Sequence, residues 1–157
     1  MLQWSGYILK TPRLRQMVTQ VQQAAGGMAC PRCSCPIHQH HLKMADLNAI
    51  PPGAALWPHV DEVVDGGACA LILLVRSAVR GGDFRVARSD EEVVWQTCRE
   101  DARRVKYRMR DTESVALFRE GEYVVFDGEK YLHEVTRVAG DVERVSLAVT
   151  LVCPRKK

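Results

Sequence analysis

The chain has 157 residues, of which 46% are hydrophobic and 26% charged, and its formal net charge is +3. This length suits one domain with its own core, and so small a charge does not by itself require an acidic partner. The longest apolar run, Ala68 to Val75, is too short to cross a membrane. Residues 1–10 lack a charged start followed by an apolar stretch, so we expect an intracellular protein, cytoplasmic or nuclear, with reduced thiols.

Residues 11–27 carry the signals of one amphipathic helix. Thr11-Pro12 is typical of a helix start, with a threonine N-cap followed by proline in the first turn. Four apolar residues then recur at helical spacing: Leu14, Met17, Val18 and Val21. Gly26-Gly27 ends the pattern. We predict that this helix packs on the outside of a sheet.

A Cys/His-rich segment follows, from Cys30 to His41. Four of its residues form a candidate structural zinc site: Cys30, Cys33, Cys35 and His38. A Cys-Pro-x-Cys knuckle suits tetrahedral zinc, but no second Cys-x-x-Cys completes a standard site, so reduced thiols without a metal are the alternative interpretation. Cys98 or Cys153 can supply a fourth ligand only if the fold brings it close.

The remaining chain contains short strand patterns divided by glycine and proline turns. The predicted strands are 68–75, 83–87, 103–110, 115–118, 122–127, 130–138 and 143–152. Many short strands behind one helix predict a mainly β protein with a jelly-roll-like barrel. Within one structural domain, we assign residues 1–46 to a helix and Cys/His-rich segment packed on the barrel, and residues 47–157 to the barrel core.

Two separate segments supply candidate metal ligands. In His59-Val60-Asp61 the imidazole and the carboxylate lie two residues apart, so an extended backbone projects both to one face. The strand-like segment Tyr131–Val135 adds His133. Two histidines and one carboxylate make the facial triad of non-haem Fe(II) oxygenases, which leaves positions for a 2-oxo acid and O₂. His-x-Asp alone is a weak signal, because such triplets arise by chance.

The alternating segment 144–149 indicates a cosubstrate. One face carries Arg144, Ser146 and Ala148, and the other carries Val145, Leu147 and Val149. An arginine inside a barrel is costly unless it meets an anion. A guanidinium beside a hydroxyl matches a carboxylate, and Ala148 leaves room for it. The distal carboxylate of 2-oxoglutarate fits this description.

The order of these motifs, His-x-Asp, then His133, then Arg144-x-Ser146, resembles the Fe(II)/2-oxoglutarate-dependent oxygenases. Asn48 and Pro52-Gly53, ahead of the first histidine, resemble the AlkB-like branch, and the middle of the chain resembles the prolyl-hydroxylase-like branch. The resemblance covers about residues 47 to 152 and implies a double-stranded β-helix of the cupin-like, jelly-roll kind.

In this family resemblance, His59, Asp61 and His133 bind iron, and Arg144 and Ser146 bind 2-oxoglutarate. Asn48 assists in binding the cosubstrate. Ile50 stands where AlkB-like members often have tyrosine, and Thr150 stands where they have a second arginine. The family is therefore clearer than the branch.

The implied reaction hydroxylates a C–H bond and releases succinate and CO₂, with O₂ and 2-oxoglutarate as cosubstrates and ascorbate as a reductant. We expect a protein side chain or a small molecule as the substrate, and no membrane partner. The first alternative is a nucleic-acid oxygenase, AlkB-like or TET/JBP-like, that uses a basic strand carrying Arg104, Lys106, Arg108 and Arg110. The second is a non-enzymatic jelly-roll metal-binding protein. The oligomeric state is left open.

Overall fold

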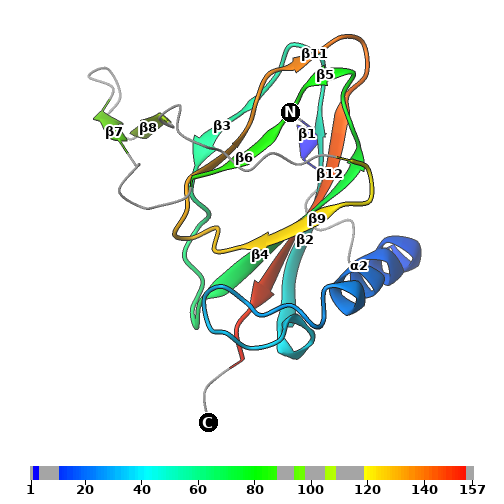
Figure 1. The fold of residues 1–157 in the computed structure, drawn as a ribbon, viewed down its shortest axis with the longest axis vertical. Coiled ribbons are helices and arrows are strands. Elements are labelled where there is room, and N and C mark those ends of the chain that lie inside the picture. The colour runs from blue at the N-terminus through cyan, green and yellow to red at the C-terminus, as the bar shows by residue number, and fades with distance from the viewer. Residues whose placement is uncertain (1, 4–10, 88–93, 98–104, 109–118, 155–157) are drawn as a thin grey trace.

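The structure is a computed structural model, which describes residues 2–3, 11–87, 94–97, 105–108 and 119–154. Its strands form a barrel of antiparallel sheets, and helix α2 (Pro12–Ala24) lies outside the barrel against one sheet (Figure 1). Thr11 is the N-cap residue and proline begins the first turn, although the threonine side chain makes no capping hydrogen bond. The predicted supporting helix is confirmed.

A five-stranded sheet forms one wall of the barrel. Its strands, in spatial order, are β1 (Leu2–Gln3), β2 (His41–Ile50), β12 (Arg144–Val152), β4 (Ala68–Arg76) and β9 (Tyr123–Phe126). The opposite wall is a three-stranded sheet of β3 (Leu56–His59), β10 (His133–Val135) and β6 (Phe84–Val86). Two small pairs complete the described strands: β5 (Arg80–Gly81) with β11 (Val138–Ala139), and β7 (Val94–Thr97) with β8 (Val105–Arg108). A 3-10 turn, η1 (Ile37–Gln39), precedes β2.

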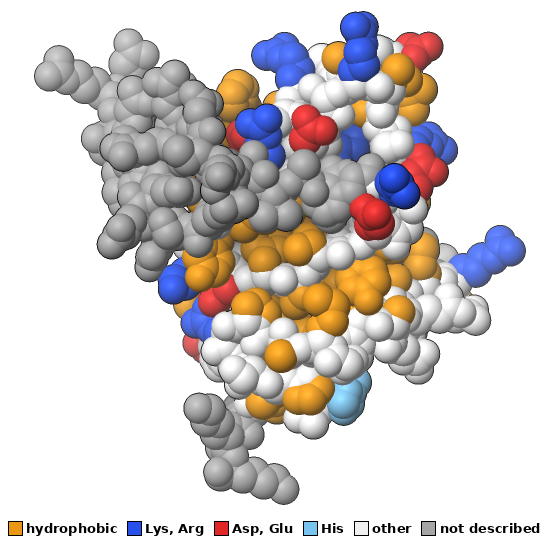
Figure 2. Space-filling view, in the orientation of Figure 1, with side chains coloured by type: hydrophobic (Ala, Val, Ile, Leu, Met, Phe, Trp, Pro, Cys, Tyr) orange, Lys and Arg blue, Asp and Glu red, His pale blue; other side chains and the backbone are white. Residues whose placement is uncertain are grey.

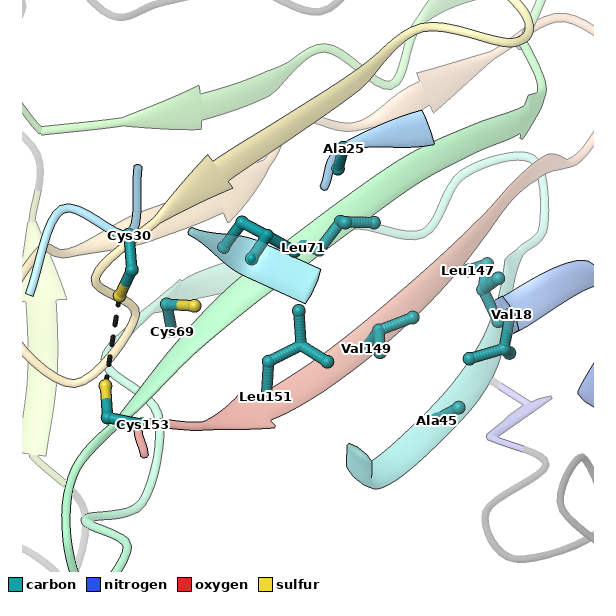
Figure 3. Close-up of a cluster of buried hydrophobic side chains, with 11 residues drawn as sticks. Val18, Ala25, Cys30, Ala45, Cys69, Leu71, Leu147, Val149, Leu151 and Cys153 are labelled. Atoms are coloured by element: carbon teal, nitrogen blue, oxygen red, sulfur yellow. Dashed lines mark hydrogen bonds between the residues drawn. The ribbon is translucent and has the colours of Figure 1, made fainter. Parts of the chain in front are cut away.

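The large sheet separates two apolar cores, because side chains alternate between its faces. Leu147 and Leu71 point outward to the core under α2, which Figure 3 shows, together with Val18 of the helix. Ile72 of the same sheet points into the barrel and joins Phe84 and other residues of the inner core. Helix α2 therefore covers the outer face and leaves the barrel interior available for a site.

On the face shown in Figure 2, charged side chains gather toward the end formed by β5 and β11, and apolar side chains occupy the middle. In the part of the chain that the structure describes, no helix has the length and apolar character needed to traverse a bilayer.

Five of the seven predicted strands coincide with observed ones, and they lie in the segments 68–76, 84–86, 123–126, 133–135 and 144–152. The predicted strand 103–110 is described only over β8, and 115–118 lies outside the described residues. Five of the described strands were not predicted: β1, β2, β3, β5 and β7. The division into a supporting segment, residues 1–46, and a barrel core, residues 47–157, stays a prediction. Strand β2 contains residues from both parts.

Candidate metal centre

The three predicted metal ligands meet at one edge of the small sheet. His59 ends β3 and His133 begins β10, and the two are directly paired across the antiparallel ladder. Asp61 follows β3, and its Oδ1 lies 3.5 Å from Nε2 of His133 and 4.0 Å from Nε2 of His59. The ligand atoms all lie within 4.8 Å of one another. Neighbouring ligands of an octahedral ion at about 2.1 Å stand roughly 3 Å apart, so a small closure of this group suffices to hold one ion.

Backbone carbonyls fix which nitrogen of each histidine faces the centre. Nδ1 of His59 lies 2.8 Å from the Trp57 carbonyl, and Nδ1 of His133 lies 3.1 Å from the Tyr131 carbonyl. A carbonyl only accepts, so each Nδ1 carries the proton and donates it. In the neutral form of each histidine, Nε2 then carries a lone pair directed toward Asp61, the arrangement that metal-binding histidines need.

The pKa shifts favour the metal-binding forms of two of these groups. Burial lowers the pKa of His59, and the nearby His133 adds to this, while the Trp57 carbonyl and Asp61 oppose it. For Asp61, burial alone would raise the pKa. When protonated, His133 donates a hydrogen bond to Asp61, and its charge and that of His59 outweigh burial and bring the pKa of Asp61 below its ordinary value. The site therefore favours a neutral imidazole and an ionised carboxylate.

Aromatic rings shield one side of His133, whereas Asp61 stays accessible. The rings of Phe126 and Phe84 lie 4.9 and 5.9 Å from the His133 ring, centroid to centroid. The His133 side chain is only 5% exposed, but that of Asp61 is 41% exposed and that of His59 34%. The group is thus dry on one side and open on the other, as an ion needs if it is to take further ligands.

A glycine makes room for the carboxylate. The Asp61 amide donates a hydrogen bond of 2.8 Å to the Gly128 carbonyl, which anchors the backbone after β3. A Cβ on Gly128 would collide with the Asp61 carboxylate. The turn at 127–130 therefore positions this ligand both by a backbone contact and by the absence of a side chain.

A cavity of about 320 Å³ inside the barrel opens onto the three ligands. Strand β2 lines it with Asp46 and Asn48, and β12 lines it with Ser146 and Ala148. Asp46, which is 4% exposed, was not predicted as a site residue. Its position two residues from Asn48 on one strand face was the available signal. A second cavity of about 450 Å³ borders His59 and Asp61 from the other side, so the group is reached from two directions.

Arg144 lies beside this cavity with an unused donor. It is 1% exposed, and its Nη1 donates a 2.9 Å hydrogen bond to Oγ of Ser146, which lines the cavity. Its Nη2 is buried without a hydrogen-bond partner. Burial lowers the pKa of Arg144 to about 10, with Asp83 opposing the shift, so the guanidinium stays charged near neutral pH. A buried, charged and partly unsatisfied guanidinium beside a hydroxyl fits an incoming carboxylate.

Gly82, which precedes Asp83, leaves space for the Arg144 side chain. Gly82 has a φ of +70°, a conformation that glycine adopts without strain, and a Cβ there would stand 3.1 Å from Cδ of Arg144. The Gly81-Gly82 turn therefore gives the arginine side chain the space it occupies.

The Cys/His-rich segment is arranged differently from the prediction. Cys30 and Cys33 do come together, but with His40 and Cys153 in place of Cys35 and His38. The His38 ring is directed elsewhere, with its Nδ1 2.8 Å from the Gly26 carbonyl.

The basic strand proposed for nucleic acid is only partly described. Arg104 and Arg110 lie outside the described residues, as does Cys98. Lys106 and Arg108 belong to β8, and the direction of their side chains is not described.

Neither a protein-family profile nor a curated protein sequence matches the chain. Solved structures do match. An apo structure of ThoJ, a non-haem monooxygenase, has a TM-score of 0.66 at 16% identity, over 97% of this chain and 59% of that one. SnoK, a non-haem α-ketoglutarate-dependent carbocyclase from nogalamycin biosynthesis, has a TM-score of 0.59 at 17% identity, over 95% of this chain and 62% of that one. EvdO2 from Micromonospora carbonacea var. aurantiaca has a TM-score of 0.65 at 14% identity, over 100% and 69%.

The chain shares its fold with the non-haem monooxygenase ThoJ and with SnoK, an α-ketoglutarate-dependent carbocyclase. The predicted mainly β, jelly-roll architecture with a supporting helix is therefore confirmed. The chain spans about three-fifths of the length of the ThoJ and SnoK structures, 59% and 62%. At identities of 16% and 17% the likeness extends to the fold, and the reaction and substrate are inferred from the site itself.

Proposed function

We propose that this chain is an oxygenase that uses Fe(II) and 2-oxoglutarate to hydroxylate a C–H bond, releasing succinate and CO₂. One observation carries the proposal. The cavity that His59, Asp61 and His133 line also contains Ser146, and Ser146 bonds the buried guanidinium of Arg144. A metal position with open sides and a carboxylate position thus share one chamber, as a 2-oxo acid with a distant carboxylate requires.

The donor set fits iron. Two imidazole nitrogens and one carboxylate suit a divalent transition metal, and three protein ligands leave other positions of an octahedron open. ThoJ, which shares the fold, also has a structure as a nickel complex. This supports the proposal that the fold holds a divalent ion.

Each residue has a defined task in the proposed site. His59 and His133 hold the ion through Nε2, and Asp61 holds it through its carboxylate. Arg144 donates Nη2–H to the distal carboxylate of 2-oxoglutarate. The Ser146 hydroxyl, which accepts a hydrogen bond from the same arginine, keeps its own proton to donate to that carboxylate. When bound, iron and 2-oxoglutarate supply the oxidising chemistry with O₂.

Other cavity residues position the ligands and limit water. Phe84 and Phe126, packed against His133, exclude water from that side of the ion. Asn48, paired across the strands with Ser146, offers an amide to the cosubstrate. Asp46 places a further polar side chain in this chamber, whose volume of about 320 Å³ suits a protein side chain or a small molecule as the substrate.

The test separates metal binding, cosubstrate binding and turnover. Anaerobic protein with Fe(II) and 2-oxoglutarate should develop a weak visible charge-transfer band, and in air with ascorbate it should release succinate. His133→Ala should abolish both, because it removes a buried ligand. His41→Ala is the matched control, since His41 is exposed at the start of β2.

Absence of the band in the wild-type protein would contradict chelation of the cosubstrate. Fe(II) binding without the band and without succinate, across peptides, nucleosides and oligonucleotides, would indicate a metal-binding protein that is not an enzyme.

A further inference from the structure

A second group of metal-ligating side chains lies on the outer side of the large sheet. Cys30 and Cys33 come from the loop after α2, His40 directly follows η1, and Cys153 directly follows β12. Their four ligand atoms lie within 4.8 Å of one another. We propose that Cys30, Cys33, His40 and Cys153 bind one structural zinc ion. The proposal does not depend on the oxygenase function.

The measured separations match a tetrahedral site. Cys30 Sγ lies 3.9 Å from Cys153 Sγ, and Cys33 Sγ lies 3.3 Å from His40 Nε2. With Zn–S near 2.3 Å and Zn–N near 2.0 Å, the edges of a zinc tetrahedron are roughly 3.5 to 3.8 Å. These two separations differ from the edges of a zinc tetrahedron by a few tenths of an ångström, and no two of the four ligand atoms are more than 4.8 Å apart.

The histidine is held in the protonation state that zinc requires. His40 Nδ1 lies 3.0 Å from the Pro36 carbonyl, which can only accept, so Nδ1 carries the proton. Nε2 is then free of a proton and faces the Cys33 sulfur. A backbone carbonyl that orients a histidine in this way is the usual support of a zinc ligand.

The backbone of the loop is folded around its two cysteines. The Cys30 amide donates to the Cys35 carbonyl at 2.9 Å, and the Ser34 amide donates to the Cys30 carbonyl at 2.8 Å. Ser34 has a φ of +63°, in the left-handed region that non-glycine residues rarely adopt. This turn brings the Cys33 side chain back beside that of Cys30, and a bound metal would offset the cost of the conformation.

Burial and donor type make this a closed zinc site. Cys30, His40 and Cys153 are 1%, 4% and 6% exposed. Three sulfurs and one imidazole suit zinc and not the oxygen-seeking ions, and four protein ligands leave no position for a substrate. All three cysteines are free; Cys30 Sγ and Cys153 Sγ, for example, are 3.9 Å apart, whereas a disulfide needs about 2.05 Å.

Cys69 provides a control within the same cluster. It is buried on β4 beside Cys30 and Cys153, as Figure 3 shows, but it is not a member of the four-ligand group. If the thiols only packed in the apolar core, replacing Cys69 and replacing Cys153 would have similar effects. Zinc binding, in contrast, requires only Cys153.

The test measures metal content in the His133→Ala background, so that zinc cannot occupy the other metal centre. Protein purified under reducing conditions should contain about one zinc per chain by mass spectrometry. Cys33→Ser and Cys153→Ser should each lower this to about a tenth or less. Cys35→Ser and Cys69→Ser should keep it, because neither residue belongs to the group.

A cysteine variant could lose zinc because it fails to fold, so a second measurement uses protein in which all four ligands are unchanged. Cobalt(II) added to zinc-free protein should give the intense thiolate charge-transfer and visible bands of a tetrahedral sulfur-rich site, which added zinc should bleach. No zinc and no such cobalt spectrum would overturn the proposal. Zinc that survives Cys33→Ser but disappears in Cys35→Ser would overturn the ligand assignment as well.

Discussion

The two metal-ligating groups of this chain differ in how the fold builds them. His59 and His133 come from the paired strands β3 and β10, and Asp61 follows β3; all three line one cavity, and His59 and Asp61 also line a second. The cysteine group comes from a loop, a turn and the end of a strand, and it faces the apolar core under α2. Three ligands with open sides suit chemistry, and four enclosed ligands suit stability. In the two assignments proposed above, one sheet lies between a reactive metal position and a structural one.

Chelation should show this difference most strongly. At neutral pH a chelator should strip Fe(II) completely from the open group, and removal of zinc should need about a hundredfold more chelator. Metal analysis after desalting measures both ions in one sample. Loss of both metals at the same chelator concentration would mean that the cysteine group is not closed.

Arg144→Met should affect only the open group. It removes the charge but keeps a long side chain, so the KM for 2-oxoglutarate should rise about 10- to 100-fold, in line with a charge-assisted hydrogen bond. Fe(II) affinity and zinc content should stay unchanged. Arg80→Met, at an exposed position on β5, is the control and should leave the KM as it is. An unchanged KM in Arg144→Met would place the cosubstrate carboxylate elsewhere.

Gly128→Ala tests how tightly the open group is packed. The added Cβ would push the Asp61 carboxylate away from His133, so we expect Fe(II) affinity to fall about tenfold. Titration of Fe(II) under anaerobic conditions measures this. Gly27→Ala is the matched control, because no atom lies within 4 Å of a Cβ at that position. Equal Fe(II) affinities for Gly128→Ala and Gly27→Ala would show that Asp61 can shift without weakening Fe(II) binding.

Arg32 links the two groups and should have the smallest effect. It lies between Cys30 and Cys33, and its Nη1 contacts Asp127 Oδ1 at 3.2 Å and Glu129 Oε2 at 2.6 Å. These acids flank the glycine against which Asp61 rests. The arginine side chain is 34% exposed, so Arg32→Ala should weaken Fe(II) binding only about two- to fivefold.

Zinc content should be unaffected by the same change, and Arg76→Ala, which breaks the exposed pair with Glu143, should alter neither metal. A large loss of zinc in Arg32→Ala would show that the arginine supports the knuckle itself.

Strands whose hydrophobic residues alternate were predictable from the sequence, and β2 was not. Its inward positions include Asp46 and Asn48, which line the cavity, so the strand lacks the apolar alternation that identifies a half-buried strand. The polar residues Asp46 and Asn48, which line the cavity, are thus the reason why β2 could not be predicted from its hydrophobic pattern. Strand β3 was missed because it is short and contains a proline.

The candidate site divides in the same way. The grouping of His59, Asp61 and His133 could be predicted because Asp61 follows His59 by two residues of extended chain, and His133 lies in a strand-like segment of its own. In the cysteine group, Cys30 and Cys33 were predicted from their local knuckle, and Cys153 was named as a ligand only on the condition that the fold brings it close. His40 was not among the predicted ligands. Cys153 is far along the chain and comes close only because β12 pairs with β2 and β4, as the antiparallel register shows.

Strand β12 has a consequence for how the chain can vary. Arg144 and Ser146 stand at one end of it, and Cys153 directly follows the other end. Successive side chains of a strand point to opposite faces. The number of residues between Ser146 and Cys153 therefore determines which face each side chain reaches. Insertion or deletion of a single residue between Ser146 and Cys153 would leave only one of them correctly placed. The proposed cosubstrate site and the proposed zinc site therefore both depend on the number of residues in β12.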